Sequence, residues 1–308
     1  MAGSRAGVTV RVPAKVNLEL TVGGPRPDGF HELATVFHAV SLYDDLTATP
    51  ADDVTITVAG TQAESVPANA DNLAVRAALL LARRTGTDAG VRMHLRKGIP
   101  VAGGMAGGSV DAAAALLACD ALWHTGLTRD DLRELAAELG SDVPFGLVGG
   151  TAIGTGRGER LTPALARGVF HWVVALSDGG LSTPAVYREI DRLRGGRVLP
   201  QPRVSEPLMQ ALRAGDARAL GLALSNDLQP AALSLDPRLD RTLSVGFDAG
   251  ALGGIVSGSG PTVVFLVEGP EHALDVSVAL AASGVAADVR RVHGPVPGAR
   301  LVDAVHDR

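Results

Sequence analysis

The chain has 308 residues, of which 46% are hydrophobic and only 3% aromatic, and it carries a net charge of −5 at neutral pH. The length suffices for one or two domains with a core of Leu, Val and Ala. The acidic balance argues against a nucleic-acid-binding protein, and apolar stretches such as 112–119 are too short for a membrane span. The N-terminus lacks the apolar segment of a signal peptide, and the single cysteine, Cys119, excludes disulfides and cysteine-based zinc sites. We therefore expect a cytoplasmic protein without nucleic-acid or membrane partners. Its oligomeric state stays open, a homodimer being one alternative.

The basic residues are almost all arginines. Only two of the 28 are lysines, Lys15 and Lys97. In such a chain each lysine is a candidate for a role that needs a compact ammonium group rather than a planar guanidinium. An ordinary surface lysine is the simpler alternative for either one.

The first part of the chain is predicted to be rich in β-strands, with one helix. A helix is expected over 72–84, with Asp71 as its N-cap. A break at Pro13-Ala14-Lys15 separates the first two strands and places Lys15 at the start of the second. The strands predicted from alternating or continuous apolar character are 8–12, 16–22, 33–42, 53–58 and 91–95.

Helices and strands are mixed in the rest of the chain. Thr128 and Asp131 have the spacing of a capping box for a helix that ends at Leu139. Further helices are expected at 111–122, 185–193, within 206–245 and at 270–282, and strands within 146–155 and at 172–176, 262–267 and 287–292. This order predicts an α+β fold in two parts, divided into residues 1–160 and 161–308.

One glycine-rich stretch stands out, and it reads IPVAGGMAGGSVDAAAAL from Ile99 to Leu116. Glycine lets the backbone turn with positive φ and lets a ligand approach closely. A helix that starts behind such a loop offers free N–H groups and the positive end of its dipole, which favours an anion such as a nucleotide phosphate. A flexible turn is the alternative from the glycines alone. Walker A, dinucleotide-binding and protein-kinase motifs are missing from the sequence.

Three stretches taken together are more specific than the loop alone. PAKVNL at 13–18, the loop at 100–109 and the second glycine cluster at 254–262 resemble the three motifs of the GHMP small-molecule kinases. The segment 13–46 is similar to the branch of this family that acts on 4-diphosphocytidyl-2-C-methyl-D-erythritol, and GSDVPF, STPAVY and NDL follow in the matching order. The resemblance covers about residues 8–267. It implies two domains with an active site between them, which transfers the γ-phosphate of ATP to the 2-hydroxyl of that substrate in the non-mevalonate isoprenoid pathway.

The resemblance also implies catalytic roles. Asp142 matches the aspartate that orients the hydroxyl and accepts its proton, and Lys15 matches the lysine that offsets charge in the transition state. Asn17, two residues further along the strand and so on the same face, would bind the substrate. The alternatives are a turn or cap role for Asp142 and a solvated position for Asn17.

The glycine loop would bind ATP through its backbone, and Ser109 would add a hydroxyl to a phosphate or to Mg²⁺. A simple N-cap role for Ser109 is equally compatible with the sequence. The family pattern Leu-Gly-Gly-Gly-Ser-Ser is replaced here by residues 105–110. Ala106 still allows a ligand to approach closely if its φ is negative, and Val110 brings no hydroxyl. The implied cofactor-binding residues are Pro100, Val101, Ala102, Gly103, Gly104, Met105, Ala106, Gly107, Gly108, Ser109 and Val110.

The substrate side is implied to bind cytosine. His31 matches the histidine that contacts the edge of the base, and the base would stack between Phe30 and Tyr187. Thr183 would line the same pocket. Phe30 stands where the family often has Tyr, so stacking is kept and a phenolic hydrogen bond is lost.

Other functions remain open from the sequence. The runner-up hypotheses are a GHMP kinase of the homoserine or mevalonate class and a non-catalytic nucleotide-binding regulator. A decarboxylase of the same superfamily is disfavoured, because it would have no use for a cytosine site. Spacing does not decide whether the second glycine cluster shapes the substrate side or supports the phosphate loop.

Overall fold

The computed structural model describes residues 7–60, 62–101 and 103–302. Its described strands form two sheets, one of eight strands and one of four. The first sheet has the order β12-β1-β2-β4-β3, with β5, β6 and β8 attached at its side, and the second has the order β11-β7-β10-β9. The strands of the first sheet are β1 (Val8–Pro25), β2 (His31–Ala51), β3 (Val54–Gly60), β4 (Gly90–Lys97), β5 (Thr151–Gly156), β6 (Arg160–Pro163), β8 (Ser225–Asn226) and β12 (Arg300–Val302). Those of the second are β7 (Phe170–Leu176), β9 (Gly253–Val256), β10 (Val263–Val267) and β11 (Asp288–Gly294).

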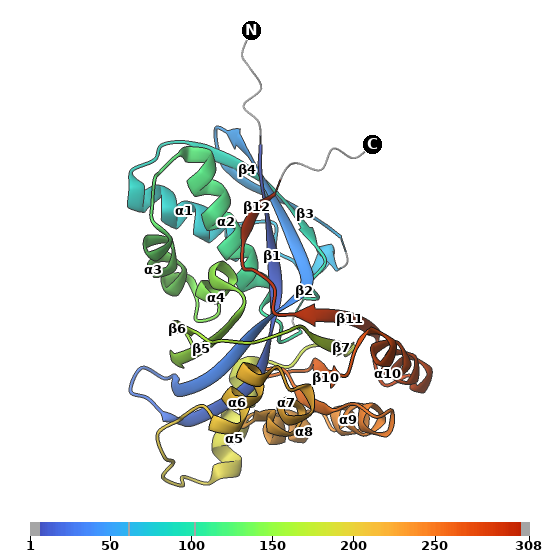
Figure 1. The fold of residues 1–308 in the computed structure, drawn as a ribbon. Helices are drawn as coiled ribbons and strands as arrows, with labels where there is room; N and C mark the ends of the chain where they lie inside the picture. The colour runs from blue at the N-terminus through green and yellow to red at the C-terminus, as the bar shows by residue number, and fades with distance from the viewer. Residues whose placement is uncertain (1–6, 61, 102, 303–308) are drawn as a thin grey trace.

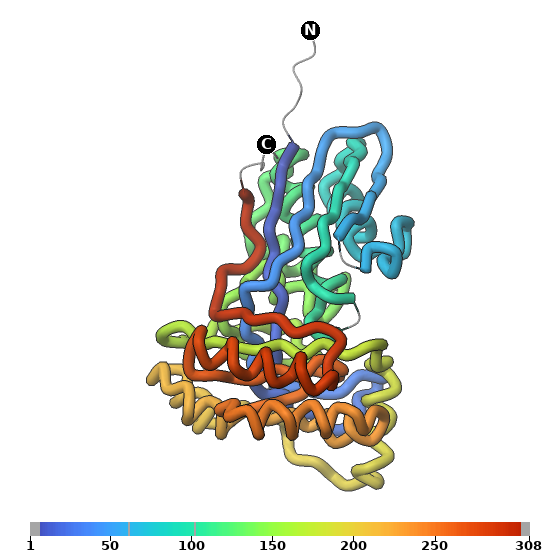
Figure 2. Tube along the Cα trace, turned by 90° about the vertical axis from the view of Figure 1, so that its right-hand side faces the viewer, coloured from blue at the N-terminus to red at the C-terminus, as the bar shows by residue number. Residues whose placement is uncertain are grey.

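The helices follow the two sheets. Figure 1 shows α1 to α4 beside the upper part of β1 and β2, and α5 to α10 around the lower sheet. The tube in Figure 2 shows the C-terminal helices layered on the four-stranded sheet. The helices are α1 (Leu73–Thr85), α2 (Gly107–Trp123), α3 (Arg129–Leu139), α4 (Val143–Val148), α5 (Thr183–Arg194), α6 (Glu206–Ala214), α7 (Ala217–Ala223), α8 (Gln229–Leu235), α9 (Arg238–Asp248) and α10 (Pro270–Ser283), with a 3₁₀ turn at Ala63–Ser65.

The first strand corrects the predicted break. β1 runs without interruption from Val8 to Pro25, and its pairing with β2 shifts between Pro13 and Ala14. Pro13 is opposite Tyr43, whereas Ala14 is opposite Val40. The proline lacks an N–H for the ladder, and a bulge absorbs it instead of ending the strand. Lys15 therefore lies just past a bulge in the middle of a long strand.

Two helix starts also differ from the prediction. The N-cap of α1 is Asn72, not Asp71, because the Asn72 side chain accepts the N–H of Ala74 at 2.8 Å. Helix α2 begins at Gly107, four residues before the predicted start. The capping box of Thr128 and Asp131 at the start of α3 is confirmed. The strands and helices predicted for the second part form, with β9 added inside the second glycine cluster.

A large core cluster joins the two sheets. Buried residues of β1, β2 and α2 belong to the same cluster as Trp172 and Val264 of the second sheet. The other face of that sheet packs against α9 and α10 in a separate cluster around Phe265. The last strand, β12, returns to pair with β1. The two sheets therefore share one core, and β1 and β2 run from the upper part of the molecule down to the lower sheet (Figure 1).

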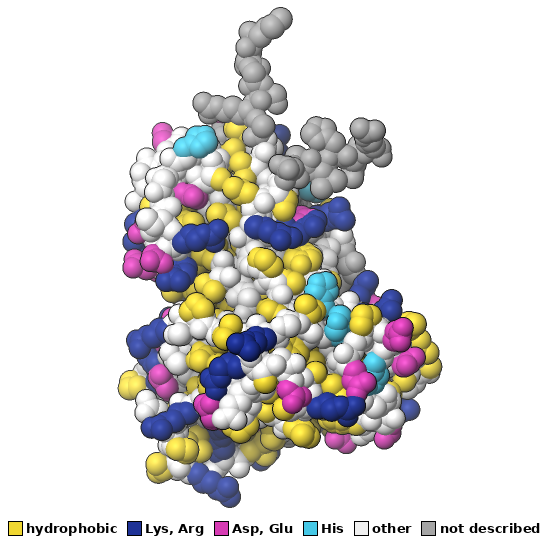
Figure 3. All heavy atoms as spheres, viewed as in Figure 1, with side chains coloured by type: hydrophobic (Ala, Val, Ile, Leu, Met, Phe, Trp, Pro, Cys, Tyr) yellow, Lys and Arg dark blue, Asp and Glu magenta, His cyan; other side chains and the backbone are white. Residues whose placement is uncertain are grey.

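Charged side chains of both signs are spread over the surface in Figure 3. On the face drawn in Figure 3, acidic and basic side chains are interspersed and form no continuous basic stripe. Along the described parts of the chain, no helix has the length and apolar character needed to cross a membrane.

Candidate active site

A cavity of about 850 Å³ opens between the two sheets. Its walls come from β1, the start of β2, the glycine loop with the N-terminus of α2, the turn before α4, helix α5 and the second glycine cluster. Most of the residues singled out in the sequence meet here. Those that line the cavity are Lys15, Asn17, Phe30, His31, Gly103, Gly104, Ala106, Gly107, Gly108, Ser109, Asp142, Thr183 and Tyr187.

Lys15 and Asn17 lie on the same face of β1, as their spacing predicts. The Lys15 Nζ atom donates a 2.7 Å hydrogen bond to Asn17 Oδ1, and Asn17 Nδ2 donates to Thr35 Oγ1 at 2.8 Å. The Lys15 side chain is only 5% exposed. A buried ammonium needs close polar partners because desolvation disfavours its charge. The amide of Asn17 thus holds the ammonium in place at the edge of the cavity.

Asp142 lies next to Lys15 in the lining of the cavity. Its Oδ2 atom lies 3.4 Å from Lys15 Nζ, and its side chain is 34% exposed. Asp142 occupies the N-cap position of the short helix α4, but its carboxylate makes no capping hydrogen bond. The carboxylate is therefore available to a hydroxyl group in the cavity. Its charge also reaches Tyr187, whose pKa is raised first by burial and then by Asp142.

The glycine loop has the geometry of an anion site. Ala106 has φ +61°, so the condition of a negative φ is not met, and this residue is the N-cap of α2. The N-cap alternative for Ser109 is also wrong, since Ser109 is the third residue of the helix. Gly104 also has a positive φ of +70°, and a Cβ there would lie 2.6 Å from the Ser257 carbonyl oxygen. The loop backbone therefore lies in front of the free N–H groups at the start of α2, where an anion could bind.

The other residues of the loop lie outside the lining of the cavity. Met105 and Val110 are fully buried in the core. Val110 packs beside Gly146 of α4. Pro100 and Val101 lie at the outer end of the loop, where the Val101 N–H donates to Gln62 Oε1 at 2.9 Å. Ala102 lies outside the described residues.

The second glycine cluster serves both sides of the cavity. Ser257 contacts the phosphate loop through its hydroxyl, 3.5 Å from the Gly104 carbonyl oxygen, and accepts the Asn17 N–H at 3.4 Å. Ser259 hydrogen-bonds Thr183 of α5 at 2.9 Å. From below, Asn226 donates to the carbonyl oxygens of Val256 and Gly258 at 2.8 and 2.7 Å. The cluster thus contacts the glycine loop, β1 and α5, and whether it supports phosphate or shapes the substrate side stays a prediction.

A second group of side chains lies at the far end of the cavity. His31 Nε2 is 3.0 Å from Asp191 Oδ1, and the His31 and Tyr187 rings are 5.0 Å apart. The Phe30 ring is half exposed and carries the Arg157 guanidinium 4.9 Å above its face. Sequence reasoning missed Asp191. The signal was present, since Thr183, Tyr187 and Asp191 recur every four residues and so share one face of α5.

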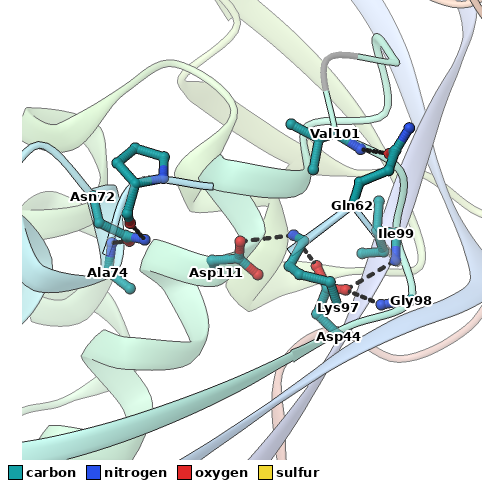
Figure 4. Close-up of polar contacts among 10 residues, drawn as sticks. Asp44, Gln62, Asn72, Ala74, Lys97, Gly98, Ile99, Val101 and Asp111 are labelled. Carbon is teal, nitrogen blue, oxygen red and sulfur yellow. Dashed lines mark hydrogen bonds and ion pairs between the residues drawn. The ribbon is translucent and has the colours of Figure 1, made fainter. Parts of the chain in front are cut away.

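Lys97, the second lysine of the chain, forms ion pairs with two carboxylates that the sequence did not identify as its partners. Its Nζ atom lies 2.5 Å from Asp44 Oδ2 and 2.7 Å from Asp111 Oδ2, and all three side chains are buried (Figure 4). Burial alone would lower the pKa of Lys97, but the charges and hydrogen bonds of the two carboxylates raise it. Burial raises the pKa of Asp111, and the neighbouring Asp44 raises it further. The three residues come from positions 44, 97 and 111, too far apart for local sequence patterns to link.

Comparison with known proteins agrees with this geometry. The models of the GHMP kinases N-terminal domain and C-terminal domain match residues 72–150 and 208–286. The 4-diphosphocytidyl-2-C-methyl-D-erythritol kinase of Streptomyces avermitilis is 59% identical over 96% of this chain and 99% of its own length. The chain belongs to this family of GHMP kinases. It is therefore an ATP-dependent kinase, and the family predicted from its motifs is confirmed.

The solved structures support the same fold. A crystal structure of 4-(cytidine 5'-diphospho)-2C-methyl-D-erythritol kinase matches with a TM-score of 0.74 at 37% identity, over 92% of this chain and 98% of that one. A homoserine kinase from Cytophaga hutchinsonii matches with the same TM-score of 0.74, but at only 19% identity, over 96% of this chain and 97% of that one. The second match shows the fold alone. The predicted two-domain α+β architecture is confirmed, and the boundary at residue 160 stays a prediction.

Proposed function

We propose that this GHMP kinase phosphorylates the 2-hydroxyl of 4-diphosphocytidyl-2-C-methyl-D-erythritol, with Asp142 as the base and Lys15 as its electrostatic partner. The observation that carries the proposal is the pairing of Lys15 and Asp142 at 3.4 Å in a cavity that also contains His31, Asp191 and Tyr187. The first pair is suited to transfer of a phosphoryl group to an alcohol. The second group is suited to a base such as cytosine.

In this proposal Asp142 accepts a hydrogen bond from the acceptor hydroxyl and takes its proton as the oxygen attacks the γ-phosphorus. Lys15, with its Nζ atom 3.4 Å from Asp142 Oδ2, offsets negative charge on the transferring group. Asn17 fixes the ammonium toward Asp142, because its Oδ1 atom already accepts one of the three Lys15 protons. Asn17 is also placed to contact the acceptor, as it lines the cavity.

ATP fits the phosphate loop. The glycines at 103, 104, 107 and 108 line the cavity, and a Cβ on Gly104 would lie only 2.6 Å from the Ser257 carbonyl oxygen, so a side chain there would distort the loop. Mg²⁺ suits oxygen donors and keeps several water and phosphate ligands. Among the described residues, no group of three or more His, Cys, Asp or Glu could hold a metal. We therefore assign Mg²⁺ to the phosphates with the Ser109 hydroxyl as a protein ligand, where it would neutralise phosphate charge.

The cytidine end is assigned to His31, Phe30, Tyr187 and Thr183. In a neutral imidazole one nitrogen donates and the other accepts. His31 Nε2 lies 3.0 Å from the Asp191 carboxylate, which can only accept, so in the neutral imidazole Nδ1 would be the acceptor. An acceptor at this place suits the 4-amino group of cytosine. Phe30 and Tyr187 would stack on the base.

The diphosphate of the substrate needs cations along the cavity. Two guanidinium groups, those of Arg157 and Arg188, line it near the proposed base site. This arrangement favours a charged nucleotide-linked alcohol over a small amino-acid alcohol. The Lys15–Asp142 pair also favours a catalyst over a silent nucleotide-binding regulator. The same assignment places the enzyme in the cytoplasm, where ATP is supplied.

The test is a kinase assay with ATP and Mg²⁺ on a panel of acceptors that includes the cytidyl substrate, homoserine and mevalonate. We expect turnover of the cytidyl substrate alone. Turnover of homoserine or mevalonate but not of the cytidyl substrate would refute the assignment. ATP binding without turnover of any acceptor would revive the regulator hypothesis. A crystal soaked with a cytidine nucleotide should show the base beside His31.

A further inference from the structure

A buried polar cluster lies behind the phosphate loop, outside the lining of the cavity. Lys97 is the last residue of β4, and Asp111 is the fifth residue of α2, so the two ends of the loop meet at one ammonium group. Asp44 brings β2 to the same point. Its Oδ1 atom accepts the N–H groups of Gly98 and Ile99 at 2.7 and 2.9 Å, as Figure 4 shows.

The loop in front of this cluster is strained. Ala106 has φ +61°, a conformation that strains a non-glycine residue and persists only where its surroundings enforce it. The next residue, Gly107, starts α2. A Cβ on Gly107 would lie 3.3 Å from Lys97 Nζ, which places the ammonium directly behind the first residue of the helix. The orientation of the helix N–H groups toward the cavity therefore depends on what holds Gly107 from behind.

The cluster also accounts for a lysine at this position. The chain uses arginine for 26 of its 28 basic residues. An ammonium fits between two carboxylates and the Gly107 backbone, whereas a planar guanidinium is larger and directs its donors in a fixed fork. The Lys97 side chain is 2% exposed, and both carboxylates are equally buried.

We propose that Lys97 is a positioning residue for ATP: by joining Asp44 and Asp111 behind the loop, it holds the strained Ala106 peptide and the N-terminus of α2 where the phosphates bind. This inference rests on the proposed binding of ATP at the glycine loop. It adds a residue that does not touch the nucleotide and acts through the backbone. The acceptor end of the cavity, around His31 and Tyr187, does not depend on it.

The test compares nucleotide and acceptor affinities in two variants. Lys97→Met combined with Asp111→Leu removes one charge of each sign and leaves Asp44 its two backbone hydrogen bonds. Lys97→Arg keeps the positive charge, but the guanidinium is larger than the ammonium that fits between the two carboxylates. We expect each folded variant to bind ADP about tenfold more weakly by isothermal titration calorimetry, with KM for ATP rising in parallel and KM for the acceptor changing less than about twofold. The matched control is Arg96→Met, which removes an exposed cation from the neighbouring position of β4.

A rescue experiment separates positioning from a general structural role. Adding Ala106→Gly to Lys97→Arg removes the strain that the cluster is proposed to hold, so part of the ADP affinity should return. Wild-type ADP affinity in either folded variant, or equal losses for ATP and acceptor, would overturn the proposal. The titration needs no acceptor. A wild-type protein that binds ADP but phosphorylates a different alcohol would refute only the proposed substrate.

Discussion

The two ends of the cavity are built in different ways. The phosphate end is a continuous stretch of backbone, in which positive φ at Gly104 and Ala106 and the start of α2 shape the surface. The acceptor end is built from side chains of β1, β2, the turn before α4 and α5, which are far apart in the sequence. The first can therefore be recognised as a local motif, and the second only as a pattern of separate residues.

The difference also bears on the departures from the family pattern at positions 105 and 110. Met105 and Val110 point into the core, so their side chains are chosen for packing and not for the ligand. At the acceptor end, polar and aromatic side chains such as Asp142, His31 and Tyr187 line the cavity themselves. We expect substitutions at the phosphate end to act through backbone shape, and those at the acceptor end to act through the group removed.

The largest effect is expected at the acceptor end. Asp142→Asn keeps the size of the side chain but removes the base, so kcat should fall about a thousandfold with little change in KM for ATP. Steady-state kinetics with both substrates varied would measure this. Asp130→Asn on α3 is the matched control and should have no effect. A kcat within tenfold of the wild type would remove the base role from Asp142.

At the phosphate end, Gly104→Ala should act through shape alone. The new Cβ would lie 2.6 Å from the Ser257 carbonyl oxygen, so the loop must shift. We expect ADP affinity to fall about thirtyfold, which corresponds to about 2 kcal/mol, while KM for the acceptor is nearly unchanged. Gly86→Ala, with φ +69° and open space around it, is the control for strain alone. Equal ADP affinities in the two variants would contradict the backbone account.

A smaller effect, on KM for the cytidyl substrate, is expected from Phe30 at the acceptor end. Removing the ring in Phe30→Ala should raise KM for the cytidyl substrate about tenfold, in line with the loss of one stacking contact. Phe30→Tyr keeps the ring face and should change KM less than about twofold. Phe247→Ala removes an equally exposed ring from α9, and it should leave KM unchanged. An Ala variant with wild-type KM would show that the base binds elsewhere.

The smallest effect is expected in stability. Ala106→Gly relieves the positive φ at this position and should raise the free energy of unfolding by about 1 kcal/mol or shift Tm by a few degrees. Nucleotide affinity should stay close to that of the wild type, since the cluster behind the loop is intact. Thermal unfolding with and without ADP would measure both quantities. A lower Tm would show that the Ala106 methyl group contributes packing that outweighs the strain.

Much of the fold was predictable because its signals are local. The capping box at Thr128 and Asp131, the buried character of 111–122 and the apolar strand at 263–267 each follow from neighbouring residues. The errors have the same origin. A proline at position 13 predicts a break, but β1 continues because the residues before and after Pro13 both pair with β2. The positive φ of Ala106 could not be predicted from the sequence either, because local sterics favour a negative φ for a non-glycine residue.

The sequence by itself determined the chemistry of this protein: a glycine loop before a helix, a rare lysine followed by Asn17, and an aspartate after a helix end. Periodicity and turn chemistry act over a few residues, so these features are visible in the chain. Only the tertiary structure decided that Lys15 lies 3.4 Å from Asp142, that Asp191 orients His31, and that Lys97 joins two carboxylates behind the loop. These contacts bring together residues 14 to 160 positions apart. Such pairs form only when both sheets and their helices pack around the shared core.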